Sequence, residues 1–82
     1  MNKSSEINLI EVISPLSLLK CKSILKNMVP GEYLIAWFKD PETVDDLTRI
    51  IKQSNDFVID KQIKDGNYKI TIQKGGGMND LP

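Results

Sequence analysis

Residues 30–41 read PGEYLIAWFKDP, and the order of the signals in this stretch decides the fold. Residues 32–38 at its centre are rich in aromatic and branched side chains, which predicts a strand near the middle of a sheet. The Pro-Gly pair before them ends a preceding helix, because proline disfavours helical geometry in the residue that it follows. The Asp-Pro pair after them begins a second helix, since an acidic cap and a proline in the first turn both favour a helix N-terminus.

The chain before this strand predicts a short strand and then a helix. Residues 6–13 mix apolar and polar positions, with Ile7 and Leu9 on one face, which suits a strand. Ser14 and Pro15 then predict a helix start, with the serine as N-cap and the proline in the first turn. Apolar side chains recur after them at intervals of three and four, which predicts a buried stripe. The stripe consists of Leu18, Cys21, Leu25 and Met28, and Leu16, Leu19 and Ile24 widen it.

The chain after the central strand predicts a helix and a hairpin. The helix runs to about residue 53, with apolar residues at helical spacing and acidic residues in its early turns, where the helix dipole favours them. Residues 57–63 and 68–73 flank Asp65 and Gly66, a pair that favours a tight turn between antiparallel strands.

These segments predict one α+β domain with the element order βαβαββ. The fold class is a two-layer α/β sandwich, with two helices on one face of a four-stranded mixed sheet. A chain of 82 residues has room for a single domain. We expect the domain to span residues 1–75 and a flexible tail to span residues 76–82, because a run of three glycines begins at residue 75.

Composition excludes several classes of function. Eleven Lys and Arg residues balance eleven Asp and Glu residues, so the net charge of zero gives no general attraction to nucleic acid or to an anionic membrane. The sequence has no histidine and one cysteine, which excludes an intramolecular disulfide, a Cys/His zinc site and an imidazole base. The N-terminal residues lack the apolar run of a secretory signal, which predicts a cytoplasmic protein without membrane insertion.

In this order the segments resemble the TusA/SirA-like family of small sulfur-carrier proteins, over about residues 7–75. That family opens with a strand followed by Cys-Pro-x-Pro, and residues 14–17 of this chain read Ser-Pro-Leu-Ser in the same frame. The family's Pro-Gly-Glu-x-Leu matches residues 30–34, and its Asp-Asp-Pro corresponds to residues 39–41. The resemblance implies the βαβαββ fold that the residue pattern also predicts.

The cysteine of that family motif is reported to accept a sulfane sulfur as a persulfide and to pass it to a partner protein. This chemistry requires a thiolate, which a helix N-terminus stabilises. Ser14 stands in the corresponding position, and a serine hydroxyl cannot form the sulfur–sulfur bond that stores the cargo. The resemblance therefore implies a relative that keeps the scaffold and lacks the carrier step, with Ser14 acting as a helix cap.

Cys21 supports an alternative function. It lies seven residues after Ser14 and belongs to the apolar stripe, where burial makes a thiol inert. The alternative is a sulfur carrier or sulfurtransferase that uses Cys21 in tRNA thiolation or sulfur metabolism, and this is the one enzyme activity that the sequence suggests.

Two surfaces of the predicted fold are candidates for binding. The resemblance implies that Tyr33, Ile35 and Trp37 share the outer face of the sheet. Such a patch marks a contact with a protein or a ligand unless neighbouring strands or the tail bury it. A flavin could stack there, or place its phosphate at a helix N-terminus, which makes a flavin or nucleotide a candidate cofactor. Lys20 and two further lysines on the first helix could meet an acidic partner, or form an ordinary solvated face. No aromatic residue lies among them, so nucleic acid is not an expected partner.

The sequence therefore predicts a non-catalytic protein-interaction module, an accessory subunit of a redox or sulfur-handling complex. We expect its binding surfaces to be the start of the first helix and the outer face of the central strand, and we expect no metal site. The candidate binding residues are Ser14, Pro15, Ser17, Lys20, Tyr33, Ile35, Trp37 and Asp40.

Overall fold

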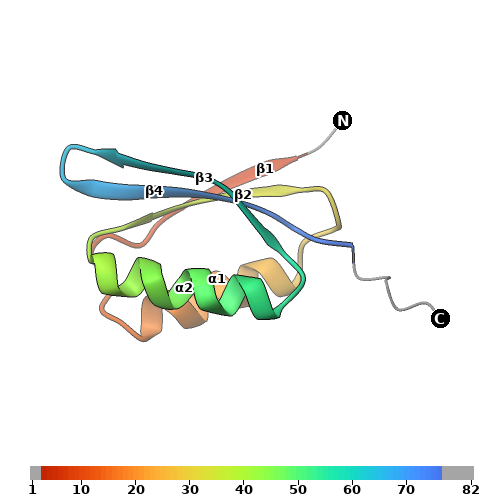
Figure 1. Cartoon of the computed structure of the whole chain (residues 1–82), viewed down its shortest axis with the longest axis horizontal. Coiled ribbons are helices and arrows are strands. Elements are labelled where there is room, and N and C mark those ends of the chain that lie inside the picture. Colours follow the sequence, from red (N-terminus) through yellow and green to blue (C-terminus); the bar gives the residue numbers. More distant parts are fainter. Residues whose placement is uncertain (1–2, 77–82) are drawn as a thin grey trace.

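Two helices pack on one face of a four-stranded sheet (Figure 1). The computed structural model describes residues 3–76. Along the chain its elements are β1 (Ser4–Asn8), α1 (Leu16–Lys26), β2 (Tyr33–Phe38), α2 (Pro41–Gln53), β3 (Phe57–Lys64) and β4 (Asn67–Gln73). The element order and the two-layer α+β architecture confirm the prediction from the sequence. Neither helix has the length and apolar character needed to cross a membrane, in the part of the chain that the structure describes.

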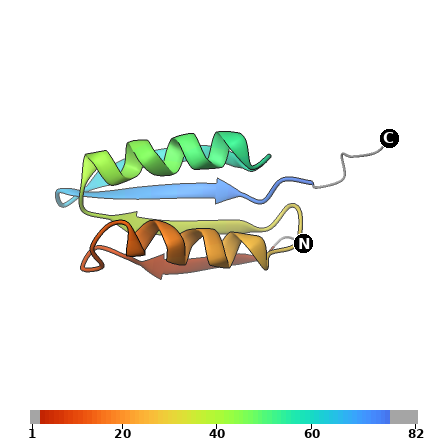
Figure 2. The same ribbon diagram turned by 90° about the horizontal axis from the view of Figure 1, so that it is seen from below.

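The sheet is mixed, with the strand order β1-β2-β4-β3. β1 runs parallel to β2, with Ile7 beside Ala36, and β4 pairs antiparallel with both β2 and β3. The predicted interior position of β2 is therefore confirmed. Figure 2 shows α1 lying over β1 and β2, while α2 lies over the β3–β4 side of the sheet.

The core lies between the helices and the sheet. Alternate residues of β2 and β4 point into it, because successive side chains of a strand point to opposite faces. Burial of each large aliphatic side chain contributes about 1.5–3 kcal/mol relative to its exposure to water. The buried apolar residues are Leu9, Leu18, Cys21, Leu25, Leu34, Ala36, Phe38, Val44, Leu47, Ile51, Ile70 and Ile72.

The connection from β1 to α1 differs from its prediction in two respects. β1 ends at Asn8 instead of continuing to residue 13, because the Asn8 side-chain carbonyl accepts a hydrogen bond of 2.9 Å from the backbone N–H of Ile10 and turns the chain. The predicted N-cap role of Ser14 is also wrong. The cap position of α1 belongs to Pro15, and no side chain caps the helix.

The stripe of α1 is narrower than its prediction. Leu18, Cys21 and Leu25 are buried, whereas Leu16 and Leu19 are exposed. At 100° per residue, the two exposed leucines lie about 140° and 160° around the helix from Cys21, so both point away from the core.

The second half of the chain follows its prediction closely. Asp40 is the cap residue of α2 and Pro41 is its first residue, although the Asp40 side chain makes no capping hydrogen bond. The helix ends at Gln53, as expected. Asp65 and Gly66 both have positive φ and join β3 to β4 in a tight antiparallel hairpin.

The glycine run begins inside the fold. Gly75 is buried, and its backbone N–H donates a hydrogen bond of 2.8 Å to the carboxylate of Asp56. The Ser54 hydroxyl donates a second hydrogen bond of 2.9 Å to the same carboxylate. Gly75 therefore closes the domain against the α2–β3 loop. The remainder of the predicted tail, residues 77–82, lies outside the described residues.

Substitution of Gly75 by alanine should destabilise the protein strongly. An added Cβ would lie 1.5 Å from the carbonyl oxygen of Asn55, so one of two backbone segments must move. We expect Gly75→Ala to lower the free energy of unfolding in urea by about 3 kcal/mol, at the upper end of the usual cost of overpacking. Gly76→Ala is the matched control, because no atom lies within 4 Å of its added Cβ. Equal unfolding midpoints for the two variants would show that Gly75 is not confined.

Candidate functional site

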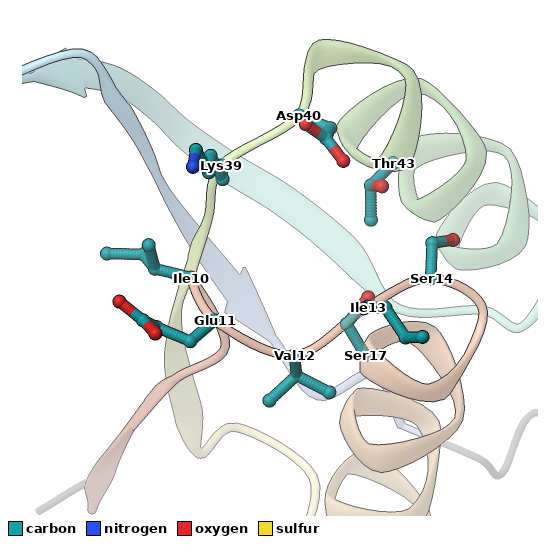
Figure 3. Close-up of a pocket in the computed structure, with 9 residues that line it drawn as sticks. All are labelled: Ile10, Glu11, Val12, Ile13, Ser14, Ser17, Lys39, Asp40 and Thr43. Carbon is teal, nitrogen blue, oxygen red and sulfur yellow. The ribbon is translucent and has the colours of Figure 1, made fainter.

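A cleft of about 540 Å³ opens at the end of the molecule where both helices begin (Figure 3). Its walls come from the β1–α1 connection, the first turn of α1, the β2–α2 connection and the first turn of α2. The lining residues are Ile10, Glu11, Val12, Ile13, Ser14, Ser17, Lys39, Asp40 and Thr43.

The parallel pairing of β1 with β2 places the cleft. Parallel strands end at the same edge of a sheet, so the chain leaves both strands on one side and both helices begin there. A helix N-terminus carries a partial positive charge and backbone N–H groups without helical partners. The cleft is therefore enclosed by two positive helix ends.

Three hydroxyl groups lie between the two helix ends. Ser14 and Ser17 contribute theirs from the α1 side, and Thr43 contributes its own from α2. Figure 3 shows the Ser17 and Thr43 side chains directed toward the space between the helices. Ser17 is 1% exposed and Thr43 is 5% exposed, so both hydroxyls lie at the floor of the cleft.

Charged groups surround the hydroxyls. Lys39 and Asp40 follow β2, and Glu11 lies on the β1–α1 connection, and all three side chains are exposed. Asp40 supplies a negative charge at the start of α2, whereas the first turn of α1 contains no acidic residue. The positive end of α1 is therefore not neutralised by its own sequence.

Apolar side chains are exposed beside the cleft. Ile13 is 76% exposed on the β1–α1 connection, and Leu16 and Leu19, three residues apart, are exposed on the outer side of α1. We call these three residues the α1 patch. Lys20 lies next to the patch, four residues after Leu16, and Pro15 is exposed at its start.

Cys21 lies outside the cleft. Its side chain is fully buried in the core, and loss of hydration on burial raises the pKa of the thiol from 9.0 to about 12. The predicted burial of Cys21 is confirmed. A thiol in this environment is protonated at neutral pH and is shielded from reagents.

The outer face of β2 is separate from the cleft. Tyr33, Ile35 and Trp37 are half-buried on the side of the sheet away from the helices. The indole N–H of Trp37 donates a hydrogen bond of 2.6 Å to the carboxylate of Glu6, and the amine of Lys69 lies 5.9 Å from the centre of the indole ring. Neighbouring strands thus cover part of the predicted patch, and Lys69 occupies one face of its largest ring.

The structure divides the predicted binding residues into two groups. Ser14, Ser17 and Asp40 meet in the cleft, whereas the residues of β2 lie on the other side of the sheet. Sequence reasoning missed Thr43 and Lys39 as cleft residues. Their positions next to a predicted helix start could have identified them, if the first two strands had been predicted to be parallel neighbours.

Within residues 3–76, no cluster of acidic or cysteine side chains could hold a metal ion.

Comparison with known proteins identifies a family and similar solved structures. The model of a family described as Sulfurtransferase TusA matches residues 5–74. Among solved structures, the chain is similar to a SirA-like protein from Desulfitobacterium hafniense. The TM-score is 0.76, and the sequence identity is 17% over 85% of this chain and 96% of that one. At this identity the structural likeness shows the fold alone. None of the curated proteins matches this sequence.

The environment of Cys21 predicts a defined pH dependence. In the unfolded chain the thiol regains a pKa near 9.0, so above this pH the unfolded state loses a proton that the folded state keeps until about pH 12. Stability should therefore fall as the pH rises above 9. The free energy of unfolding should fall more steeply between pH 9 and 11 for the native chain than for Cys21→Ala.

Native Cys21 should also react with iodoacetamide at least 100-fold more slowly than the urea-unfolded chain. Equal pH slopes, or equal alkylation rates, would contradict the buried environment.

Proposed function

This chain belongs to the TusA family, and on that premise we propose that it docks onto a sulfur-relay protein without carrying sulfur itself. The observation that supports this proposal is that the residue in the position of the family's cysteine is a serine, whereas the thiol of this chain lies elsewhere. Ser14 lies at the mouth of the cleft, in the frame where the family motif has its cysteine, and the lone thiol of Cys21 is sealed in the core.

The missing step follows from the chemistry of the two atoms. A carrier thiolate attacks the outer sulfur of a donor persulfide, forms a new sulfur–sulfur bond and releases the donor as a thiolate. The Ser14 hydroxyl is neutral at physiological pH, and no histidine exists in the sequence to activate it. Cys21 has the sulfur atom that the reaction requires. Its raised pKa keeps the thiol protonated, and its burial prevents contact with a donor persulfide.

The α1 patch supports the docking role. Ile13, Leu16 and Leu19 expose apolar area around the position where a carrier would present its cargo. Lys20 adds a positive charge at the edge of this area. The surface therefore suits a partner that presents an apolar contact bordered by acidic residues.

The flavin that the sequence suggests, on the outer face of β2 or at a helix N-terminus, stays a prediction. On that face, the Trp37 N–H is bound to Glu6 and the Lys69 amine lies 5.9 Å from the centre of the ring. The rival function, sulfur transfer through Cys21, requires the core to open during each cycle and is separated from the docking role by the following experiment.

Persulfide loading tests the missing carrier step. The chain is incubated with a cysteine desulfurase and free cysteine, and the intact mass is measured before and after reduction. We expect no gain for the native chain and a reducible gain of one sulfur atom for Ser14→Cys, because this substitution places a thiol at the positive end of α1. Cys21→Ala is the control. A gain in the native chain that disappears in Cys21→Ala would establish the rival function.

Binding to the cysteine desulfurase of the same cell tests the docking role. Leu16→Asp places a charge inside the α1 patch and should weaken the Kd at least tenfold, because a carboxylate must then be desolvated in an apolar contact. Val29→Asp is the matched control, since Val29 is an equally exposed apolar residue beyond the opposite end of α1. The docking role would be wrong if the native chain did not bind, or if both variants bound equally well.

A further inference from the structure

We propose that the cleft binds a small molecule through a tetrahedral oxyanion, a phosphoryl or sulfuryl group held between the first turns of α1 and α2. The floor of the cleft carries the proposal. Two polar side chains that are almost completely buried, Ser17 from α1 and Thr43 from α2, are both directed there toward the space between the helices (Figure 3).

These two hydroxyls have no partner within the described part of the chain. The side-chain hydrogen bonds among residues 3–76 involve neither of them. No polar side-chain atom in the same range is sealed from solvent without a partner, so both oxygens reach the space of the cleft. Both hydroxyls can therefore donate a hydrogen bond to a ligand that enters the cleft.

The electrostatic environment favours an anion at the α1 side of the cleft. The first turn of α1 has neither an acidic residue nor a side-chain cap, so its partial positive charge is available to a ligand. Lys39 adds a full positive charge at the rim. Asp40 and Glu11 oppose an anion, and Asp40 lies at the start of α2. The oxyanion should therefore lie nearer to α1 than to α2.

The size and the walls of the cleft describe the rest of the ligand. A volume of about 540 Å³ exceeds the space that one oxyanion fills and lies within the range of pockets for small organic molecules. Ile10, Val12 and Ile13 are the apolar residues among those that line the cleft. The oxyanion is thus one end of a larger molecule whose other end contacts these side chains.

The proposed site does not depend on the docking role. Ile13 borders both surfaces, but docking is tested at the exposed Leu16 on α1, whereas the oxyanion site is tested at the buried Ser17 and Thr43 between the helices. The substitutions that test one leave the residues of the other intact, so either proposal can fail alone.

Titration with inorganic phosphate at constant ionic strength tests the site, with backbone amide shifts followed by NMR. We expect saturable shifts centred on the amides of the first turns of α1 and α2. Ser17→Ala and Thr43→Val should each raise the Kd for phosphate about tenfold, the usual effect of one lost hydrogen bond to a charged group. Thr71→Val is the matched control for Thr43→Val, because Thr71 is a half-buried threonine on the opposite face of the sheet.

A variant that removes a negative charge should change the Kd for phosphate in the opposite direction. Asp40→Asn removes a negative charge from the rim and should lower the Kd for phosphate several-fold, provided that the amide spectrum shows the native fold. The proposal is wrong if phosphate causes no saturable shifts at the cleft. It is equally wrong if Thr71→Val weakens binding as much as Thr43→Val, or if Asp40→Asn weakens it.

Discussion

The parallel pairing of β1 with β2 is the constraint on which the rest of the structure depends. In a mixed sheet of four strands this is the one parallel pair, and it requires a crossover that carries the chain from one end of the sheet to the other. α1 forms that crossover, and α2 begins beside it because β2 ends where β1 ends. Antiparallel pairing would have placed the two helix starts at opposite ends. The cleft, its hydroxyl floor and its two positive helix ends all follow from the shared direction of two short strands.

Ser14 and Cys21 show that the surroundings of a side chain decide its reactivity more than whether it carries oxygen or sulfur. Ser14 lies in the turn before the cap residue of α1, whereas Cys21 lies in the middle of the helix, on its buried face. Ser14 reaches the cleft, whereas Cys21 contacts the sheet and loses its hydration. A thiol at the start of a helix would be activated by the helix dipole, whereas the thiol of Cys21 is a component of the core.

Much of this fold could be predicted from the sequence because it depends on local signals. The periodicity of α2, the Asp65–Gly66 turn and the alternation in β2 each require only nearby residues, and each was confirmed. The end of β1 could not be predicted, because it depends on which backbone N–H the Asn8 side chain selects. The sequence did not identify Thr43 as a site residue for a different reason. Its role depends on the pairing of strands that are distant in sequence, which no local pattern specifies.

The residue at position 14 affects the charge at the start of α1. A thiolate at position 14 would itself neutralise the positive end of α1, as carboxylates do at helix starts. A neutral hydroxyl leaves that charge uncompensated, and the first turn of α1 supplies no acidic residue in its place. An external anion can then complete the helix end, with the Ser17 and Thr43 hydroxyls fixing its position. The neutral serine before α1 thus bears on the charge that the cleft is able to accept.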